Sequence, residues 1–178
     1  MGNFAIYEER PTKEMFLRIL QNGGFTLDCT HQIGEAHQSG SRWVFREDVR
    51  PFSSYNEPTK EDKRVYCVTN WVGDYFTCPT KELNLETLQN VLDDMDTMRI
   101  HGKGRRIGPT GYANEFVGAY HAIGAWVYEK DDEEWVAIDP VRFIMGLDNA
   151  LQRARWLGQK AIWDLQNNCE ILVGDDEE

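Results

Sequence analysis

The sequence predicts an α+β fold, a single domain with a mainly antiparallel sheet and two or three packed helices. Short runs rich in β-branched and aromatic residues recur along the chain and are joined by turn-forming residues, as in antiparallel sheets. Other segments repeat their apolar residues at helical spacing. The 178 residues contain no internal repeat and no linker. We therefore expect one domain over 1–178, ending in a short disordered acidic tail.

The N-terminal half is expected to hold one helix among short strands. Pro11 and Thr12 mark the start of the helix, with Thr12 as its N-cap. The sequence NGG at 22–24 marks its end, because glycine readily adopts the left-handed backbone of a helix C-terminus. Residues 30–40 and 50–63 are polar and are expected to form loops. Strands are expected at 3–9, 25–29, 41–47 and, as one or two strands, 64–78.

A second helix is expected from Asn84, which can cap it, to about Met98. Its apolar residues recur at helical spacing; they are Leu85, Leu88, Leu92 and Met95.

The remaining chain predicts a hairpin and a long helix. Strands at 116–129 and 135–139 are expected to pair around the sequence KDDEE, and Pro140 is expected to break the hairpin and start a helical turn. The longest helix is expected from Asp148 to about Asn167. Its aliphatic residues should face inward, with Trp156 and Trp163 beside them covering the sheet.

The charge of the chain narrows its function. With 30 acidic and 19 basic residues the net charge is −11, so nucleic acid and anionic membrane surfaces would repel the protein. No apolar run approaches the roughly 20 residues that span a bilayer. The first residues also lack the pattern of a signal peptide. We expect a cytoplasmic protein that binds no membrane and no nucleic acid directly.

The basic stretch HGKGRRIGPTG at 101–111 suggests an anion site. It does not match a phosphate-binding loop, because Tyr112 follows Gly111 where lysine is required, and its glycine spacing does not match a dinucleotide site. The cations also balance the acidic end of the preceding helix and complement its dipole. Anion binding by Lys103, Arg105 and Arg106 remains the alternative interpretation.

The sequence CTHQIGEAH contains possible metal ligands. Cys29, His31, Glu35 and His37 suit zinc, or a cysteine–histidine nucleophile pair, by residue type. Their spacing matches no established metal-site template, so we expect no bound metal and no cofactor.

Catalytic carboxylates are not distinguished by the sequence. Asp28, Asp74 and Asp139 lie at expected strand ends, where general acids often occur. In such an acidic chain most of these positions are expected on the surface. We therefore assign no catalytic residue and favour a protein that is not an enzyme.

The densest acidic stretch lies in the predicted hairpin. The expected partner-binding residues are Glu129, Asp131, Asp132, Glu133 and Glu134, with Glu86 and Asp93 from the preceding helix. Charge at a hairpin can also serve solubility or protect an exposed strand edge. As a functional surface, it would be offered to a basic protein, with carboxylates in place of nucleic-acid phosphates.

The main hypothesis is an acidic, non-enzymatic binding protein that inhibits or sequesters a basic, nucleic-acid-handling protein. A small, acidic, tryptophan-rich chain without a catalytic motif has the profile of phage anti-defence proteins, nucleic-acid mimics and toxin-immunity proteins. The alternative is a small enzyme or ligand-binding protein for a phosphorylated or nucleotide-like molecule, which would use the loop 101–111.

Overall fold

The computed structural model describes residues 6–7, 9–28, 43–45, 64–101, 105–106, 116–117 and 122–174. The helices are α1 (Thr12–Asn22), α2 (Leu85–His101) and α3 (Leu147–Trp156), with a 3-10 turn, η2 (Thr80–Glu82). The strands are β1 (Ile6–Tyr7), β2 (Gly24–Asp28), β3 (Trp43–Phe45), β4 (Val65–Thr69), β5 (Phe76–Pro79), β6 (Arg105–Arg106), β7 (Phe116–Val117), β8 (Ala122–Lys130), β9 (Glu133–Met145), β10 (Ala161–Asp164) and β11 (Cys169–Leu172).

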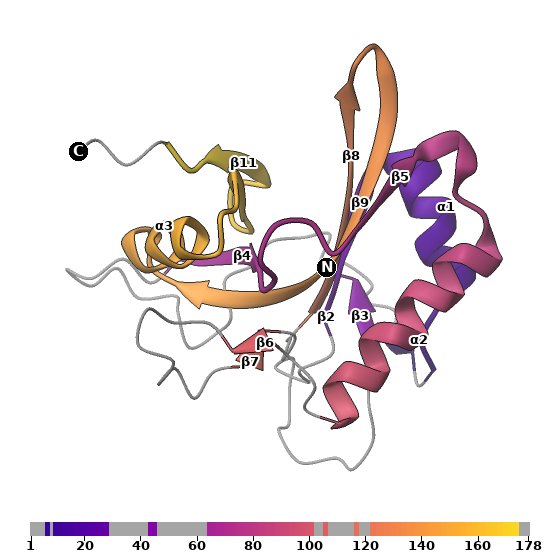
Figure 1. Ribbon diagram of the computed structural model, residues 1–178, viewed down its shortest axis with the longest axis horizontal. Coiled ribbons are helices and arrows are strands. Elements are labelled where there is room, and N and C mark those ends of the chain that lie inside the picture. The colour runs from indigo at the N-terminus through magenta and orange to yellow at the C-terminus, as the bar shows by residue number, and fades with distance from the viewer. Residues whose placement is uncertain are drawn as a thin grey trace.

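Within the described residues, nine strands form one antiparallel sheet in the order β1-β3-β2-β8-β9-β4-β10-β11, with β5 also paired to β9. Strands β6 and β7 pair separately. The helices pack against the sheet (Figure 1), which confirms the predicted α+β class. None of the described helices combines the length and the apolar character needed to cross a membrane.

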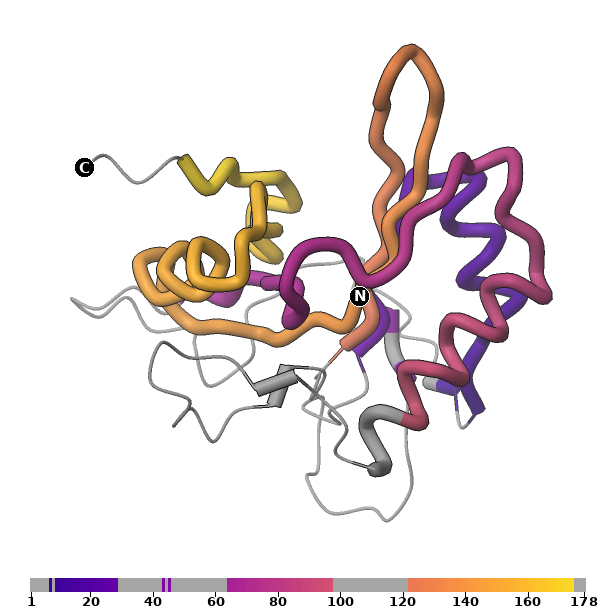
Figure 2. Tube along the Cα trace, viewed as in Figure 1, coloured from indigo at the N-terminus to yellow at the C-terminus, as the bar shows by residue number. Residues whose placement is uncertain are grey.

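Strand β9 is central to the sheet because it pairs with three other strands, β8 on one edge and β5 and β4 on the other. One edge pairs with β8 throughout, from Ala122 opposite Val141 to Lys130 opposite Glu133. The other edge is shared: β5 pairs with the first half of β9 and β4 pairs with the second half. The β8–β9 hairpin projects beyond the three helices in Figures 1 and 2.

Pro140 lies inside β9, so the prediction that it breaks the hairpin and starts a helical turn was wrong. It lies between the segments paired with β5 and β4, opposite Ile123 of β8. Its carbonyl oxygen accepts a hydrogen bond from the Asn70 amide at 2.7 Å, on the edge where β4 has just ended. Proline is tolerated there because its missing N–H faces an interruption in the neighbouring strands.

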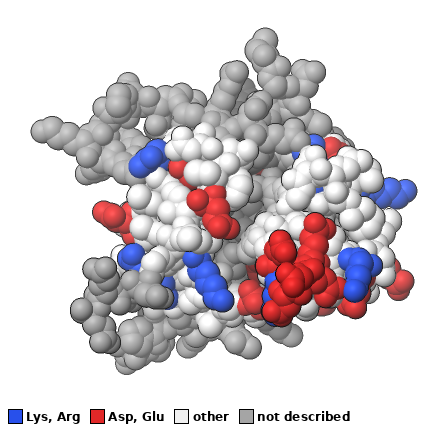
Figure 3. Space-filling model, turned by 90° about the horizontal axis from the view of Figure 1, so that it is seen from above, with Lys and Arg blue, Asp and Glu red and all other residues white. Residues whose placement is uncertain are grey.

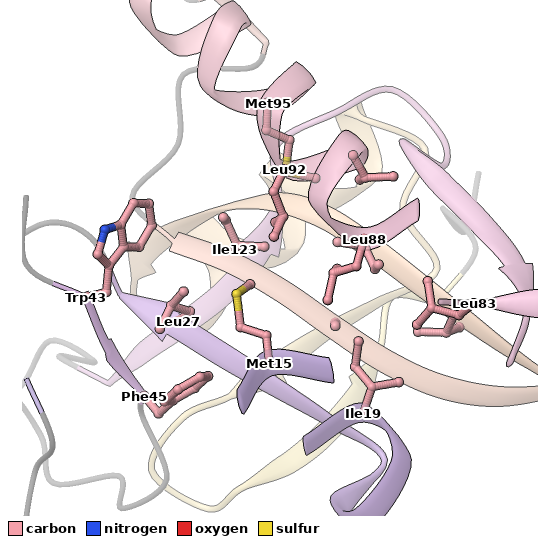
Figure 4. Packing of buried hydrophobic residues seen from close by; sticks show 14 residues of the cluster. Met15, Ile19, Leu27, Trp43, Phe45, Leu83, Leu88, Leu92, Met95 and Ile123 are labelled. Atoms are coloured by element: carbon pink, nitrogen blue, oxygen red, sulfur yellow. The ribbon is translucent and has the colours of Figure 1, made fainter. Parts of the chain in front are cut away.

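The main core lies between the sheet and the pair α1 and α2. Met15 and Ile19 of α1 and Leu88 and Leu92 of α2 point toward sheet residues such as Ile123 (Figure 4). Apolar spacing within each helix produces this inward face, and the burial of large side chains stabilises it. A second cluster joins α3 to β4 and β10 on the other side of the hairpin (Figure 2).

The predicted start of α2 is confirmed, because the side-chain oxygen of Asn84 accepts a hydrogen bond from the Thr87 amide at 2.8 Å. The prediction that Thr12 caps α1 was wrong. Pro11 occupies the N-cap position without a side-chain cap, and Thr12 is the first helical residue.

The predicted long C-terminal helix was also wrong. Helix α3 ends at Trp156, and Gly158 then adopts a positive φ of 68° that ends helical geometry. Strands β10 and β11 follow and pair with each other and with β4. Trp156 and Trp163 are 40% and 37% exposed, so they do not cover the sheet as expected.

Candidate functional site

The tip of the β8–β9 hairpin is a two-residue turn formed by Asp131 and Asp132. Their φ angles are +54° and +60°, as the turn type favoured in tight hairpins requires. Asn-Gly is the usual pair in such turns, because glycine has no Cβ to clash in this region. Aspartate tolerates the left-handed region better than most residues and is itself common at the first position of such turns, so it is Asp132 that stands where glycine is favoured.

The five acidic residues predicted to bind a partner lie at the end of the hairpin, on β8, the turn and β9. Glu129 lies directly opposite Glu134, and Glu133 lies opposite Lys130. Like charges opposite each other in neighbouring strands are destabilising. Figure 3 looks down on the hairpin and shows Asp and Glu side chains gathered over its tip.

Two lysines lie within this acidic cluster. The Lys81 ammonium of η2 is 2.6 Å from a carboxylate oxygen of Glu133, although the Lys81 side chain is 74% exposed. The hydrogen bond to Glu133, followed by its charge, raises the pKa of Lys81. The Lys130 ammonium lies 4.8 Å from the centre of the Trp135 ring. Five carboxylates and two ammonium groups leave a net charge of −3 (−5 + 2).

The two acidic residues predicted on α2 have different surroundings. Glu86 is exposed in the first turn of the helix. Asp93 lies two turns further along, where Arg10 donates to it at 2.7 Å and also pairs with Asp96. Hydrogen bonds from Arg10, followed by Gln89, lower the pKa of Asp93. Asp93 therefore links the segment before α1 to α2, and its charge is already paired with Arg10.

Several other predicted residues fall where side chains are not described. Lys103 lies outside the described residues, and Arg105 and Arg106 are described only as the backbone of β6, paired with β7. The candidate ligands Cys29, His31, Glu35 and His37 lie outside the described residues as well. Within the described residues, no group of three or more acidic, histidine or cysteine side chains could hold a metal ion.

Asp139 is buried, with 1% of its surface exposed, and so is Asp28, so the expectation that such residues lie on the surface was wrong for both. One Asp139 oxygen accepts a hydrogen bond from the Tyr75 amide at 2.9 Å. The other oxygen is buried and has no hydrogen-bond partner among the described residues. Burial raises the pKa of Asp139 to about 7; the Tyr75 hydrogen bond opposes this shift and the charge of Asp74 adds to it.

The loop beside Asp139 is fixed to α3 and to the turn that follows it. Arg153 donates to the side-chain oxygen of Asn70 at 2.8 Å. The Gln159 amide donates to the carbonyl oxygens of Trp71 and Gly73 at 2.7 and 2.8 Å. These bonds hold the connection between β4 and β5 over the gap at which Asp139 and Pro140 lie. We assign Asp139 a structural role in this conformation, because a substrate could not reach so enclosed a carboxyl group.

Sequence reasoning also missed an aromatic surface on the hairpin. Trp126, Tyr128 and Trp135 lie on one face by the strand register, with Tyr128 directly opposite Trp135. Their neighbours Val127 and Val136 belong to the main core, so the three rings lie on the opposite face and are half-buried. The alternation of residues within WVYEKDDEEWVAID was the signal that could have identified this face.

Comparison of the chain with protein-family models, curated proteins and solved structures found no match.

Proposed function

We propose that the protein is an acidic, non-enzymatic binding protein whose hairpin tip binds a basic protein. The partner class that suits this chemistry is a protein that handles nucleic acid, whose cationic surface would accept carboxylates in place of phosphates. The composition of the chain has the profile of phage anti-defence proteins, nucleic-acid mimics and toxin-immunity proteins. The protein would inhibit or sequester such a partner by occupying its basic surface.

One observation carries this proposal: the tip holds its charges against local structural preference. Asp131 and Asp132 occupy a positive-φ turn in which Asn-Gly would be more stable, and Glu129 faces Glu134 across the strands. Solubility needs charge somewhere on the surface and does not require it at these disfavoured positions. A binding surface does require it there, because a projecting tip presents its charge to a partner with little interference from the rest of the molecule.

The test compares two variants that lose the same charges. The hairpin variant is Asp131→Asn/Asp132→Asn/Glu133→Gln/Glu134→Gln. The control variant is Glu9→Gln/Asp94→Asn/Asp148→Asn/Glu170→Gln, which neutralises two aspartates and two glutamates exposed on other elements. Both variants have a net charge of −7 (−11 + 4).

Proteins captured from a lysate by the wild type are identified, and the dissociation constant of each is measured at two salt concentrations. The hairpin variant is expected to bind at least tenfold more weakly at low salt and to show a flatter salt dependence. The control variant is expected to stay within about threefold of the wild type. Equal losses in both variants would reduce the effect to net charge and contradict a binding site at the hairpin.

A further inference from the structure

The aromatic face of the hairpin combines half-buried rings with the carboxylate of Glu133 and, beyond it, the acidic turn. Tyr128 and Trp135 lie opposite each other on this face, and the next pair toward the tip is Lys130 and Glu133. Both rings belong to paired strands of the sheet and are half-buried. The face is therefore both ordered and partly open to solvent.

A cation already lies over one of these rings. The Lys130 ammonium is 4.8 Å from the centre of Trp135, within the range of a cation–π interaction, for which tryptophan is the strongest ring. Lys130 is exposed and is the last residue of β8, so its side chain can leave the ring without disturbing the core. The contact demonstrates that the Trp135 face accepts a positive charge in this position.

We propose that Trp135, with Tyr128 beside it, receives an arginine side chain of the basic partner in place of Lys130. This inference rests on the proposed function and specifies the chemistry that the hairpin recognises. The acidic tip would attract any cationic segment, whereas the ring would select among cations.

Arginine is favoured over lysine for a physical reason. The guanidinium group is planar and weakly hydrated, so it stacks on an indole ring while its N–H groups donate to neighbouring carboxylates. Glu133 lies on the same face as Trp135, two residues nearer the tip, and supplies such an acceptor, which the guanidinium would share with Lys81. An ammonium group is more strongly hydrated and loses more on leaving water, so a lysine would gain less from the same ring.

The test uses hexa-arginine and hexa-lysine peptides, which carry equal side-chain charge, and measures their dissociation constants by calorimetry at fixed salt. Trp135→Leu is expected to weaken hexa-arginine binding by about threefold to tenfold and to leave hexa-lysine binding within twofold. The control is Trp156→Leu on α3, where Arg153 lies 5.3 Å from the ring centre. It is expected to change neither affinity.

Lys130→Gln provides a second test that leaves the ring and the core intact. Loss of the Lys130 charge is expected to strengthen the binding of both peptides. Release of the Trp135 ring is expected to strengthen hexa-arginine binding further, so the arginine-to-lysine affinity ratio should rise at least twofold. An unchanged ratio in both Trp135→Leu and Lys130→Gln overturns the arginine site.

Asp131→Asn/Asp132→Asn separates this inference from the proposed function, because it should lower the affinity for both peptides by the same factor. If that variant weakens the binding of both peptides while Trp135→Leu and Lys130→Gln leave the arginine-to-lysine affinity ratio unchanged, the acidic tip binds cations and the ring does not select them. If it leaves both affinities unchanged, the proposed function fails together with the inference.

Discussion

Asp139 has a raised pKa because it is buried at a gap between two strands that pair with the same edge of β9. Asp139 lies between the part of β9 that pairs with β5 and the part that pairs with β4. The Tyr75 amide therefore takes the place of a strand neighbour. One oxygen is satisfied by this bond, and the buried second oxygen has no partner in the described part of the chain. A proton on that oxygen removes the unfavourable buried charge, which is the cause of the raised pKa.

We predict that Asp139→Asn stabilises the protein increasingly as pH rises. The folded-state pKa of about 7 lies above the ordinary value of 3.8. The contribution of the wild-type group to stability is therefore fully present below pH 4 and is lost as pH rises through 7. Relative to the wild type, the variant should gain about 2–3 kcal/mol in unfolding free energy between pH 5 and pH 8. Urea unfolding at both pH values measures this gain.

Asp164 provides the control for this prediction because it is buried but satisfied. One oxygen accepts from the amides of Gln166 and Asn167 at 2.9 and 3.1 Å, and the other accepts from the Asn167 side chain at 2.7 Å. Asp164→Asn should lower stability at pH 7 by about 1–3 kcal/mol, since it places an amide donor against another donor. A stability difference between wild type and Asp139→Asn that does not vary with pH would contradict the assignment for Asp139.

At the scale of elements, sequence patterns predicted those elements whose stability is local. Helix α2 follows its apolar spacing, with Leu88, Leu92 and Met95 fully buried, and Asn84 caps it as expected. The segment after Trp156 also has apolar residues at helical spacing, yet it forms β10 and β11. Pairing of Trp163 with Cys67 of β4, a contact between distant segments, outweighed the local preference.

The two core residues after α3 test how that region is packed. Leu157 is fully buried, and Ile162 of β10 packs in the cluster beneath α3. We predict that Leu157→Ala and Ile162→Ala each lower the unfolding free energy by about 2–5 kcal/mol, because each leaves a cavity. Leu172→Ala is the control, since that side chain is 73% exposed and its loss should have little effect. Denaturation midpoints equal to that of the wild type would contradict the packing of α3 on β10.

The turn of the hairpin yields a prediction that separates stability from binding. Asp131→Asn/Asp132→Gly introduces the pair favoured by the observed backbone, so the unfolding free energy should rise by about 0.5–2 kcal/mol. The same change removes two charges from the tip, so partner affinity should fall. Thermal unfolding and a binding titration on the same sample measure both effects. A variant that gains stability and keeps full affinity would contradict a functional role for the two aspartates.

At the scale of the whole molecule, the site was only partly predictable. The acidic run at 129–134 was evident from composition alone, and the hairpin brings its carboxylates together. The aromatic face depends on which residues share one side of paired strands, and no sequence prediction assigned Trp126 or Trp135 to such a face. The burial of Asp139 depends on a loop between β4 and β5 that packs on α3 and on the turn after it, which no local pattern specifies.

The net charge of the molecule leads to a prediction about the rate of association. Changing Lys103, Arg105 and Arg106 to Gln lowers the net charge from −11 to −14 (−11 − 3). If the acidic field steers a basic partner, this variant should associate about two- to threefold faster at low salt, with an unchanged dissociation rate. The difference should vanish near 0.5 M salt, where the Debye length falls to only a few Å. Stopped-flow mixing with the identified partner at both salt concentrations measures it. Slower association or loss of binding would instead make the basic stretch a contact surface and favour the anion-binding enzyme or ligand-binding protein.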